Sequence, residues 1–143
     1  MSLRNLYISS LLVLILSLCV GCTHNNGDIG PFFGKWKMQR MTINGVDDAN
    51  YKCNVFWSFQ SSTIGFIRVV SDTRYNDTFG NWAVDDAYTT MRLSFPDEIF
   101  PPFSELQLER ESELEIVKIK GPEMILKYIT KDSDEIVYYL EKW

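Results

Sequence analysis

Short runs in which apolar and polar side chains alternate are the sequence feature that most constrains the fold. In one run Val55, Trp57 and Phe59 occupy every second position, and in another Met91 and Leu93 do so. A period of two places successive side chains on opposite faces of a β-strand, so each run predicts a strand with one buried face. Aromatic residues make up 14% of the chain and recur beside Val, Ile and Thr, which favours β-strands over a helical bundle. We therefore predict an all-β domain.

Eight such runs follow one another, and turn-forming residues separate them. The predicted strands are residues 35–43, 51–60 and 63–71, a run that carries Phe79 and Trp82, and residues 88–95, 114–120, 124–130 and 135–142. The apolar phase slips between Ile116 and Val117, which predicts a β-bulge. Strands in hairpin succession suit an eight-stranded antiparallel up-and-down barrel, because closing the sheet leaves no unpaired edge strand. A β-sandwich with a similar number of strands is the alternative.

Prolines interrupt this pattern between the fifth and sixth predicted strands. Pro96, Pro101 and Pro102 cannot donate to a strand ladder, and residues 104–107 resemble a helix-capping box. We therefore expect one long loop or short helix over residues 96–113. Long loops often carry function, and the apolar side chains on this one form a candidate partner surface that consists of Ile99, Phe100 and Phe103.

The amino-terminal residues have the pattern of a secretory signal. Arg4 precedes an almost uncharged stretch, residues 6–20, and small residues follow at its end. A membrane-spanning helix is the alternative, but the apolar part is shorter than the roughly 20 residues that spanning requires, and no basic cluster follows it. The polar, glycine-bearing residues 23–30 are typical of a flexible tether.

The sequence Cys19-Val20-Gly21-Cys22 resembles the lipobox of bacterial lipoproteins. That resemblance implies cleavage before Cys22 and attachment of a lipid to its thiol; an ordinary thiol of a secreted chain is the alternative. It also implies the outer membrane, because Thr23 stands where an aspartate can retain such proteins at the inner membrane. The chain then divides into a lipoprotein signal peptide (1–21), a tether and barrel-plugging segment (22–33) and a barrel (34–143).

The barrel begins with Gly34-Lys35-Trp36, and the same spacing of glycine and tryptophan returns at Gly80-Asn81-Trp82. Together with the predicted strands and the lipobox, this opening resembles the small bacterial lipocalin-like lipoproteins. The resemblance implies a lipocalin-like barrel in a cell-envelope protein that a lipid anchors in the membrane. We expect a structural role in closing the barrel for Gly34, Trp36, Gly80 and Trp82, and Lys142 is a candidate to cover Trp36.

The charged and nucleophilic residues give no pattern for catalysis. The only histidine is His24, in the tether, so the barrel has no histidine for a general base or a zinc site. Residues 132–135 offer carboxylates for calcium but lack the spacing and glycine of a calcium loop, which favours a hairpin turn. Cys53 falls in an alternating run, where a small buried thiol is expected. We therefore expect no enzyme, metal or cofactor, and the formal net charge of −5 argues against nucleic acid as a partner.

The interior of the barrel is the candidate site. An eight-stranded barrel is either filled by its own side chains or holds one small ligand, and the sequence leaves both outcomes open. The predicted site for a small apolar or aromatic ligand, in which Arg40 would orient the ligand, consists of Arg40, Trp57, Phe59, Met91, Leu126, Tyr128 and Tyr138. We expect a lipid-anchored, non-enzymatic envelope protein that binds such a ligand. The alternative is an accessory subunit that contacts an envelope protein through residues 96–113.

Overall fold

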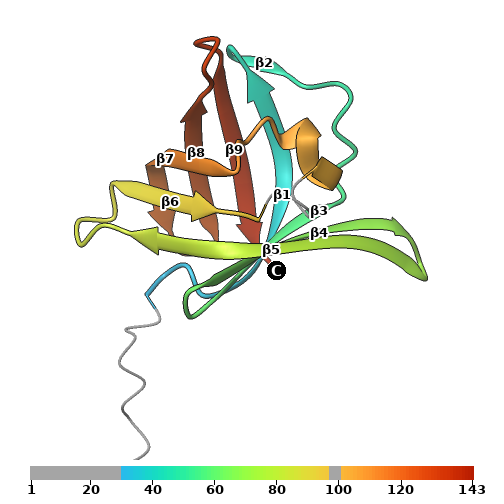
Figure 1. Ribbon diagram of the computed structural model, residues 1–143, viewed down its shortest axis with the longest axis horizontal. Coiled ribbons are helices and arrows are strands. Elements are labelled where there is room, and N and C mark those ends of the chain that lie inside the picture. Colours follow the sequence, from blue (N-terminus) through green and yellow to red (C-terminus); the bar gives the residue numbers. More distant parts are fainter. Residues whose placement is uncertain (1–29, 97–100) are drawn as a thin grey trace, which may run out of the picture. The chain divides into compact units, whose positions relative to one another are not determined.

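Nine β-strands and one short 3-10 helix (η1) follow one another in the part of the chain that the structure describes (Figure 1). The computed structural model describes residues 30–96 and 101–143, so the predicted signal peptide, Cys22, Ile99 and Phe100 lie outside them. No helix within these ranges is long and apolar enough to cross a membrane. The elements are β1 (Gly34–Ile43), β2 (Val46–Asp47), β3 (Val55–Gln60), β4 (Thr63–Ser71), β5 (Arg74–Val84), β6 (Thr90–Ser94), η1 (Pro101–Leu106), β7 (Glu111–Lys120), β8 (Glu123–Ile129) and β9 (Glu135–Lys142).

All nine strands form one antiparallel sheet, and the sheet closes on itself. From β3 to β9 each strand pairs with the next one in sequence, while β1 pairs with both β3 and β9. The two-residue strand β2 pairs with β1 at the side of the barrel, so eight strands make up the closed part. The β1–β9 ladder joins the two edges that a sandwich would leave apart. The predicted eight-stranded up-and-down barrel is therefore confirmed.

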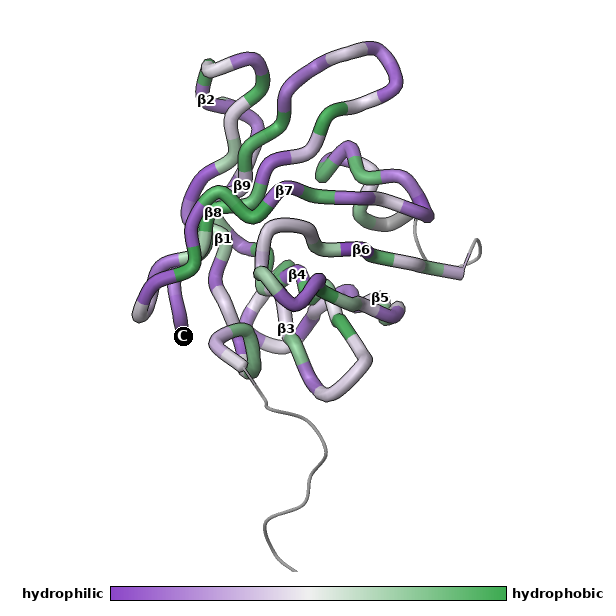
Figure 2. The backbone as a smooth tube through the Cα atoms, turned by 90° about the vertical axis from the view of Figure 1, so that its left-hand side faces the viewer, coloured by the Kyte–Doolittle hydropathy of each residue, from purple (hydrophilic) through white to green (hydrophobic). Residues whose placement is uncertain are grey.

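Side chains alternate between the interior of the barrel and its outer surface. In β8 the side chains of Met124, Leu126 and Tyr128 are buried, and those between them are partly exposed. Hydrophobic and hydrophilic residues follow one another along β6 in Figure 2, and its Met91 and Leu93 are buried. The inward side chains of the barrel strands form a single cluster, which is the core. Burial of one face of each strand thus fixes which residues line the interior.

The register shifts in three strand pairs, β7–β8, β1–β9 and, between Val69 and Ser71, β4–β5, and the first two bear on the predicted faces. The register of β7 against β8 shifts between Ile116 and Lys118, which confirms the predicted bulge. The register of β1 against β9 shifts between Met38 and Arg40, where the sequence analysis expects regular alternation. This second bulge leaves Met38 and Met41 buried and turns Arg40 outward. The expected inward position of Arg40 is therefore wrong.

The third strand is shorter than expected. It begins at Val55 instead of residue 51, because Cys53 adopts a positive φ of 55°, which interrupts an extended strand. Cys53 is only partly buried, and its thiol lies 3.7 Å from the carbonyl oxygen of Met38. The expectation of a buried thiol on the inward face of a strand is therefore wrong.

The likeness of Gly80 and Trp82 to Gly34 and Trp36 suggests that a strand begins at Gly80. No strand begins there. Gly80 lies inside β5, next to Asn81, the residue at which β5 stops pairing with β4 and starts pairing with β6. A Cβ atom on Gly80 would collide with the carbonyl oxygen of Ser94. Glycine is needed here because β6 approaches closely where β5 changes partner.

One end of the barrel, which we call the Trp36 end, is closed by aromatic side chains. Nε1 of Trp36 donates a hydrogen bond of 2.7 Å to the carbonyl oxygen of Phe32. The ring of Phe32 packs edge-on against Trp82 and Tyr88, with ring centres 5.6 and 5.3 Å away. The ammonium of Lys142 lies 4.6 Å from the centre of the Trp36 ring. These contacts place both predicted tryptophans at this end and put Lys142 over Trp36.

The chain enters β1 through Gly34, whose φ of 113° is one that a side chain rarely tolerates. A Cβ atom on Gly34 would also lie 3.3 Å from the Lys142 side chain that covers Trp36. The two residues before it differ, since Phe32 is 1% exposed and Phe33 is 46% exposed. Of the segment predicted to plug this end, Phe32 fills the barrel and Phe33 does not.

Candidate functional site

Six of the seven predicted ligand-site residues lie together in the barrel interior. At the centre, the Trp57 ring has its midpoint 4.7 Å from that of Phe66 and 5.2 Å from that of Tyr138. The six are at most 7% exposed, and they are Trp57, Phe59, Met91, Leu126, Tyr128 and Tyr138. Strands β3, β6, β8 and β9 position them, because each residue occupies an inward position of its strand. Their role in binding a ligand stays a prediction.

Arg40 does not belong to this group. The bulge in β1 places its side chain outside the barrel, where it is 52% exposed and forms an ion pair of 2.8 Å with Asp47. Its guanidinium carbon lies 4.0 Å from the centre of the Tyr139 ring. The prediction that Arg40 orients a ligand in the interior is therefore wrong.

Three phenylalanines extend the aromatic wall beyond the predicted residues. Phe66 of β4 stacks on Phe95 with 4.9 Å between ring centres, and it lies 5.8 Å from Phe103 of η1. Phe66 lies two positions after Ile64 in the sequence, so the period of two that predicts an inward Trp57 also predicts an inward Phe66. No comparable signal marks Phe103, because a proline-rich segment has no strand periodicity.

The 3-10 helix η1 closes the barrel away from the Trp36 end (Figure 1). Its Phe103 and Leu106 side chains are fully buried, and we call these two side chains the plug. The guanidinium of Arg68 lies 4.9 Å from the centre of the Phe103 ring and forms an ion pair with Glu105. The predicted place of Phe103 on an exposed partner surface is therefore wrong, because its ring leaves water by entering the apolar interior.

Polar atoms of aromatic side chains lie in this apolar interior. Nε1 of Trp57 is buried and has no hydrogen-bond partner among the described residues. Oη of Tyr138 donates a hydrogen bond of 2.6 Å to the carbonyl oxygen of Leu106, so its partner belongs to η1. Burial raises the pKa of Tyr138 well above its ordinary value, which keeps the phenol protonated and able to donate. Nε1 of Trp82, whose ring packs against Phe59, is likewise buried without a partner among the described residues. Trp57 is the unpartnered donor whose ring lies beside Tyr138, and the hydroxyl of Tyr138 is bound to the backbone of η1.

A shallow hollow lies at the rim of the barrel beside the plug. Residues that line it are Asn50, Tyr51, Lys52, Asn54, Arg68 and Glu105. Oη of Tyr51 donates to the carbonyl oxygen of Met38 at 2.5 Å and accepts from the amide of Val55 at 3.3 Å, and burial raises the pKa of Tyr51. The hollow gives solvent access to the ion pair of Arg68 and Glu105, which holds η1 from outside.

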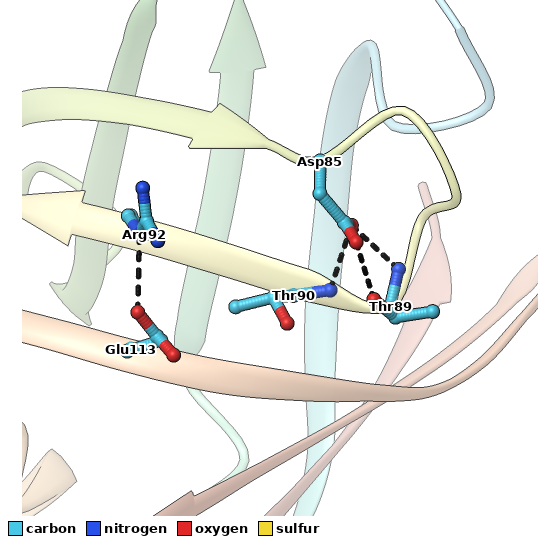
Figure 3. A network of polar contacts seen from close by, with 5 residues as sticks. All are labelled: Asp85, Thr89, Thr90, Arg92 and Glu113. Atoms are coloured by element: carbon cyan, nitrogen blue, oxygen red, sulfur yellow. Dashed lines mark hydrogen bonds and ion pairs between the residues drawn. The ribbon is translucent and has the colours of Figure 1, made fainter.

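A polar network between β5, β6 and β7 holds the strands in place (Figure 3). Asp85 accepts hydrogen bonds from the amides of Thr89 and Thr90 at 2.7 and 2.9 Å and a third from the Thr89 hydroxyl, and these bonds lower the pKa of Asp85. Arg92 and Glu113 form an ion pair of 3.0 Å between β6 and β7. Within residues 30–96 and 101–143, no three His, Cys, Asp or Glu side chains are grouped so that they could hold a metal ion. Asp85 therefore stabilises the turn between β5 and β6, and the ion pair of Arg92 and Glu113 joins β6 to β7.

Solved structures similar to this chain share its barrel. A lipocalin-like protein from Bacteroides uniformis matches with a TM-score of 0.64 and 15% sequence identity, over 80% of this chain and 100% of its own. An uncharacterized protein from Bacteroides eggerthii matches with a TM-score of 0.56 and 14% identity, over 78% of this chain and 99% of its own. No protein-family model matches the chain, and no curated protein matches it significantly. The closed eight-stranded sheet and these likenesses show that the chain has a lipocalin-like barrel fold.

Proposed function

We propose that this protein is a non-enzymatic binder of a small apolar or aromatic ligand and that a lipid on Cys22 anchors it in the outer membrane. The lipocalin-like barrel supports the binding role, since barrels of this size have room for one small ligand when their own side chains do not fill them. The lipobox-like residues that end at Cys22 support the anchor. The two parts are independent, because binding rests on the barrel and anchoring on the amino-terminal residues.

The observation that carries the binding role is the unpartnered Nε1 of Trp57. A buried N–H group without a partner costs about 1–3 kcal/mol, and a ligand that brings an acceptor atom to Trp57 removes this cost. Tyr138 becomes a second donor once Leu106 moves away, and its ring centre is 5.2 Å from that of Trp57. The favoured ligand therefore has an apolar or aromatic body and one acceptor, such as a carbonyl oxygen.

Binding requires the plug to leave the interior. The Phe103 ring packs beside Phe66, so a ligand takes the place of this ring. Burial of a phenylalanine side chain contributes about 1.5–3 kcal/mol, and an ion pair at a partly exposed rim adds at most about 1 kcal/mol. A ligand ring of similar size recovers the burial energy of the Phe103 ring, and a hydrogen bond from Trp57 to the ligand favours the ligand further. The plug then acts as an internal competitor.

Removal of this competitor is the test of the binding role. We expect Phe103→Ala to bind N-phenyl-1-naphthylamine, whose fluorescence rises in apolar surroundings, about 10-fold or more tightly than the wild type does, because the probe no longer displaces a buried ring. Val117→Ala, at an exposed position of β7, is the matched control and leaves the affinity unchanged. If neither the wild type nor folded Phe103→Ala takes up the probe, the interior is a packed core and the binding role is wrong.

A second pair of probes tests the part of Trp57. We expect Trp57→Phe to weaken binding of 2-acetylnaphthalene, which carries a carbonyl oxygen, about 5-fold to 10-fold. Binding of naphthalene itself changes little, because the hydrocarbon has no acceptor for Nε1. Equal effects on both compounds would show that Trp57 contributes only apolar surface.

The anchor has its own test in cells. We expect Cys22→Ser to move the protein from the membrane fraction to the soluble fraction, because the lipid has no thiol to join. Serine replacement of Cys53, which lies in the barrel, is the control and leaves the fractionation unchanged. Unchanged fractionation of Cys22→Ser contradicts the anchor and leaves the binding role untouched.

The alternative role, an accessory subunit that contacts an envelope protein through residues 96–113, has less support. Burial of Phe103 removes one of its three predicted contact residues. The other two, Ile99 and Phe100, lie outside the described residues. Ligand binding is therefore the function that the interior supports best.

A further inference from the structure

One side of the barrel carries large apolar side chains on its outer surface. They come from β3, β4 and β5 and from the residue that follows β9. We call them the outer aromatic face, which consists of Phe56, Ile67, Val69, Tyr75, Phe79 and Trp143. Tyr75 is 66% exposed and Trp143 is 71% exposed, whereas Phe56, whose ring contacts that of Trp143, is only 8% exposed. Exposed apolar side chains that lie next to one another often mark an interaction surface.

The register of the sheet makes these side chains neighbours. Val69 pairs with Tyr75, and Gly65 pairs with Phe79, so that Ile67 lies between the two pairs along β4. The Phe79 ring lies directly over Gly65, where a Cβ atom would be 2.8 Å from the ring. The face therefore continues along the hairpin of β4 and β5, which projects beyond the rest of the barrel in Figure 1.

Two lysines of β1 stand among the rings. Nζ of Lys35 lies 4.4 Å from the centre of the Phe56 ring, and Nζ of Lys37 lies 5.4 Å from that of Trp143. The Phe56 and Trp143 rings meet edge-on, with 5.3 Å between their centres. Two acidic residues are neighbours of the face, since Asp77 pairs with Ile67 on β4 and Glu141 of β9 pairs with Lys37. The edge of the face at β1 is therefore aromatic and carries two ammonium groups, of which Lys37 is paired opposite Glu141 and Lys35 opposite Ser58.

We propose that the outer aromatic face docks on the surface of a lipid bilayer that contains anionic headgroups. Tryptophan and tyrosine rings favour the headgroup level of a bilayer because they are both apolar and polar, and lysines beside them attract anionic lipids. This occupant accounts for the exposed rings and the two lysines together. The proposal rests on the lipid anchor proposed above, which brings the barrel to a membrane.

The tether has a length that suits this role. Gly30 lies eight residues after Cys22, and a chain of this length spans at most about 29 Å. The ten residues of β1 extend over about 33 Å, so an anchored barrel stays within its own length of the bilayer. Short tethers give effective concentrations of about a millimolar, and a face that binds the bilayer weakly is then occupied. The chain also reaches Lys35, at the edge of the face, five residues after Gly30.

Binding to vesicles tests the proposal with residues 23–143, the mature chain without its lipid. This chain retains the whole barrel, and the result does not depend on whether Cys22 is lipidated. We expect sedimentation with vesicles of phosphatidylcholine and phosphatidylglycerol at millimolar lipid, and weaker sedimentation with phosphatidylcholine alone or at high salt. Lys35→Glu combined with Lys37→Glu lowers the membrane partition coefficient about 10-fold or more on anionic vesicles. Trp143→Ser lowers this coefficient both on anionic vesicles and on vesicles of phosphatidylcholine alone.

Matched controls come from β7, which does not contribute to the face. Lys118→Glu combined with Lys120→Glu changes charge equally, and Val117→Ser removes an exposed apolar side chain; we expect both to bind like the wild type. Equal effects of face and control variants overturn the proposal, as does equal binding of the wild type to both kinds of vesicle. A dimer of the wild type that Trp143→Ser converts to monomer would also overturn the proposal. So would a photo-crosslink in cells between a benzophenone side chain placed at Tyr75 and one other protein. Failure of the Cys22→Ser test alone contradicts only the anchor.

Discussion

The two ends of the barrel are closed by different kinds of structure. At the Trp36 end the closing side chains belong to the sheet or lie next to it: Phe32 precedes β1, Trp36 belongs to β1, and Lys142 belongs to β9. At the other end the plug comes from η1, which lies outside the sheet. A hydrogen bond from Tyr138 to the backbone of η1 and contacts of Arg68 hold this segment.

This difference indicates that the two ends open at different free energies. Trp36 and Lys142 cannot leave the Trp36 end without loss of strand pairing, whereas the plug can leave while the sheet stays intact. Segments with few hydrogen bonds to the rest of a protein open locally at lower free energy than the core does. The weakly closed end is the one through which a ligand would reach Trp57.

The largest expected effect is that of Trp36→Ala. Truncation of this fully buried ring should lower the free energy of unfolding by about 3–5 kcal/mol, because the cavity lies where rigid strands cannot collapse around it. Chemical denaturation measures the loss. A loss below about 1 kcal/mol would mean that the Trp36 end is as loosely closed as the plug.

Phe103→Ala should cost clearly less, about 2 kcal/mol, although its ring is equally buried. The reason is that η1 can shift and partly fill the space that the ring leaves. The same denaturation experiment compares the two variants directly. Equal losses for Phe103→Ala and Trp36→Ala would contradict the difference between the ends.

Tyr138→Phe removes the bond to Leu106 and should cost about 1 kcal/mol. The effect should be local, because the lost bond holds η1 and not the sheet. Hydrogen exchange of the Gln107 amide, which bonds to Ser104, should become faster. The Trp143 amide, which bonds to Lys35 at the Trp36 end, is the internal control and should not change. Faster exchange at both amides would show that the two ends are coupled.

The smallest expected effect is an acid-dependent loosening of the Trp36 end through Asp85. The Thr89 hydroxyl and the amides of Thr90 and Thr89 lower the pKa of this carboxyl below its ordinary 3.8. A lowered pKa in the folded state means that the carboxylate stabilises the fold above pH 3.8 and that this contribution is lost as the pH falls through the folded pKa. The same turn carries Tyr88, which packs on Phe32. Asp85→Asn should therefore flatten the decrease in stability below about pH 4, as thermal unfolding at a series of pH values measures. An unchanged slope in Asp85→Asn would mean that the turn does not support this end.

Much of the barrel was predictable because β alternation is a local pattern. Alternation predicts strands over residues 63–71 and 135–142, and β4 and β9 have these positions to within a residue. The bulge in β7 was visible as a slip of the apolar phase at Val117. The bulge in β1 does not follow from the sequence analysis. Met41 stands one position out of phase with Trp36 and Met38, but a regular strand in which Trp36, Met38 and Arg40 share the inward face is equally compatible with the sequence.

The candidate site was predictable only in part. Alternation indicates that Trp57 and Tyr138 point inward, and both do. It does not indicate what fills the space between the strands, because this depends on which loop folds back over the barrel. The proline-rich segment predicts a loop that exposes Phe103, but that ring lies against Phe66.

The sequence alone specifies an all-β chain, eight successive strands and most of the inward side chains, because each of these follows from the period of neighbouring residues. The pairing of β1 with β9, which decides between a barrel and a sandwich, joins residues about 100 positions apart. Packing between distant segments set the remaining features. It placed Phe103 inside and Arg40 outside, and it brought Phe56 and Trp143 together on one outer face. These features depend on strand register and on which segment covers which end, and both are determined by contacts between residues that lie far apart along the chain.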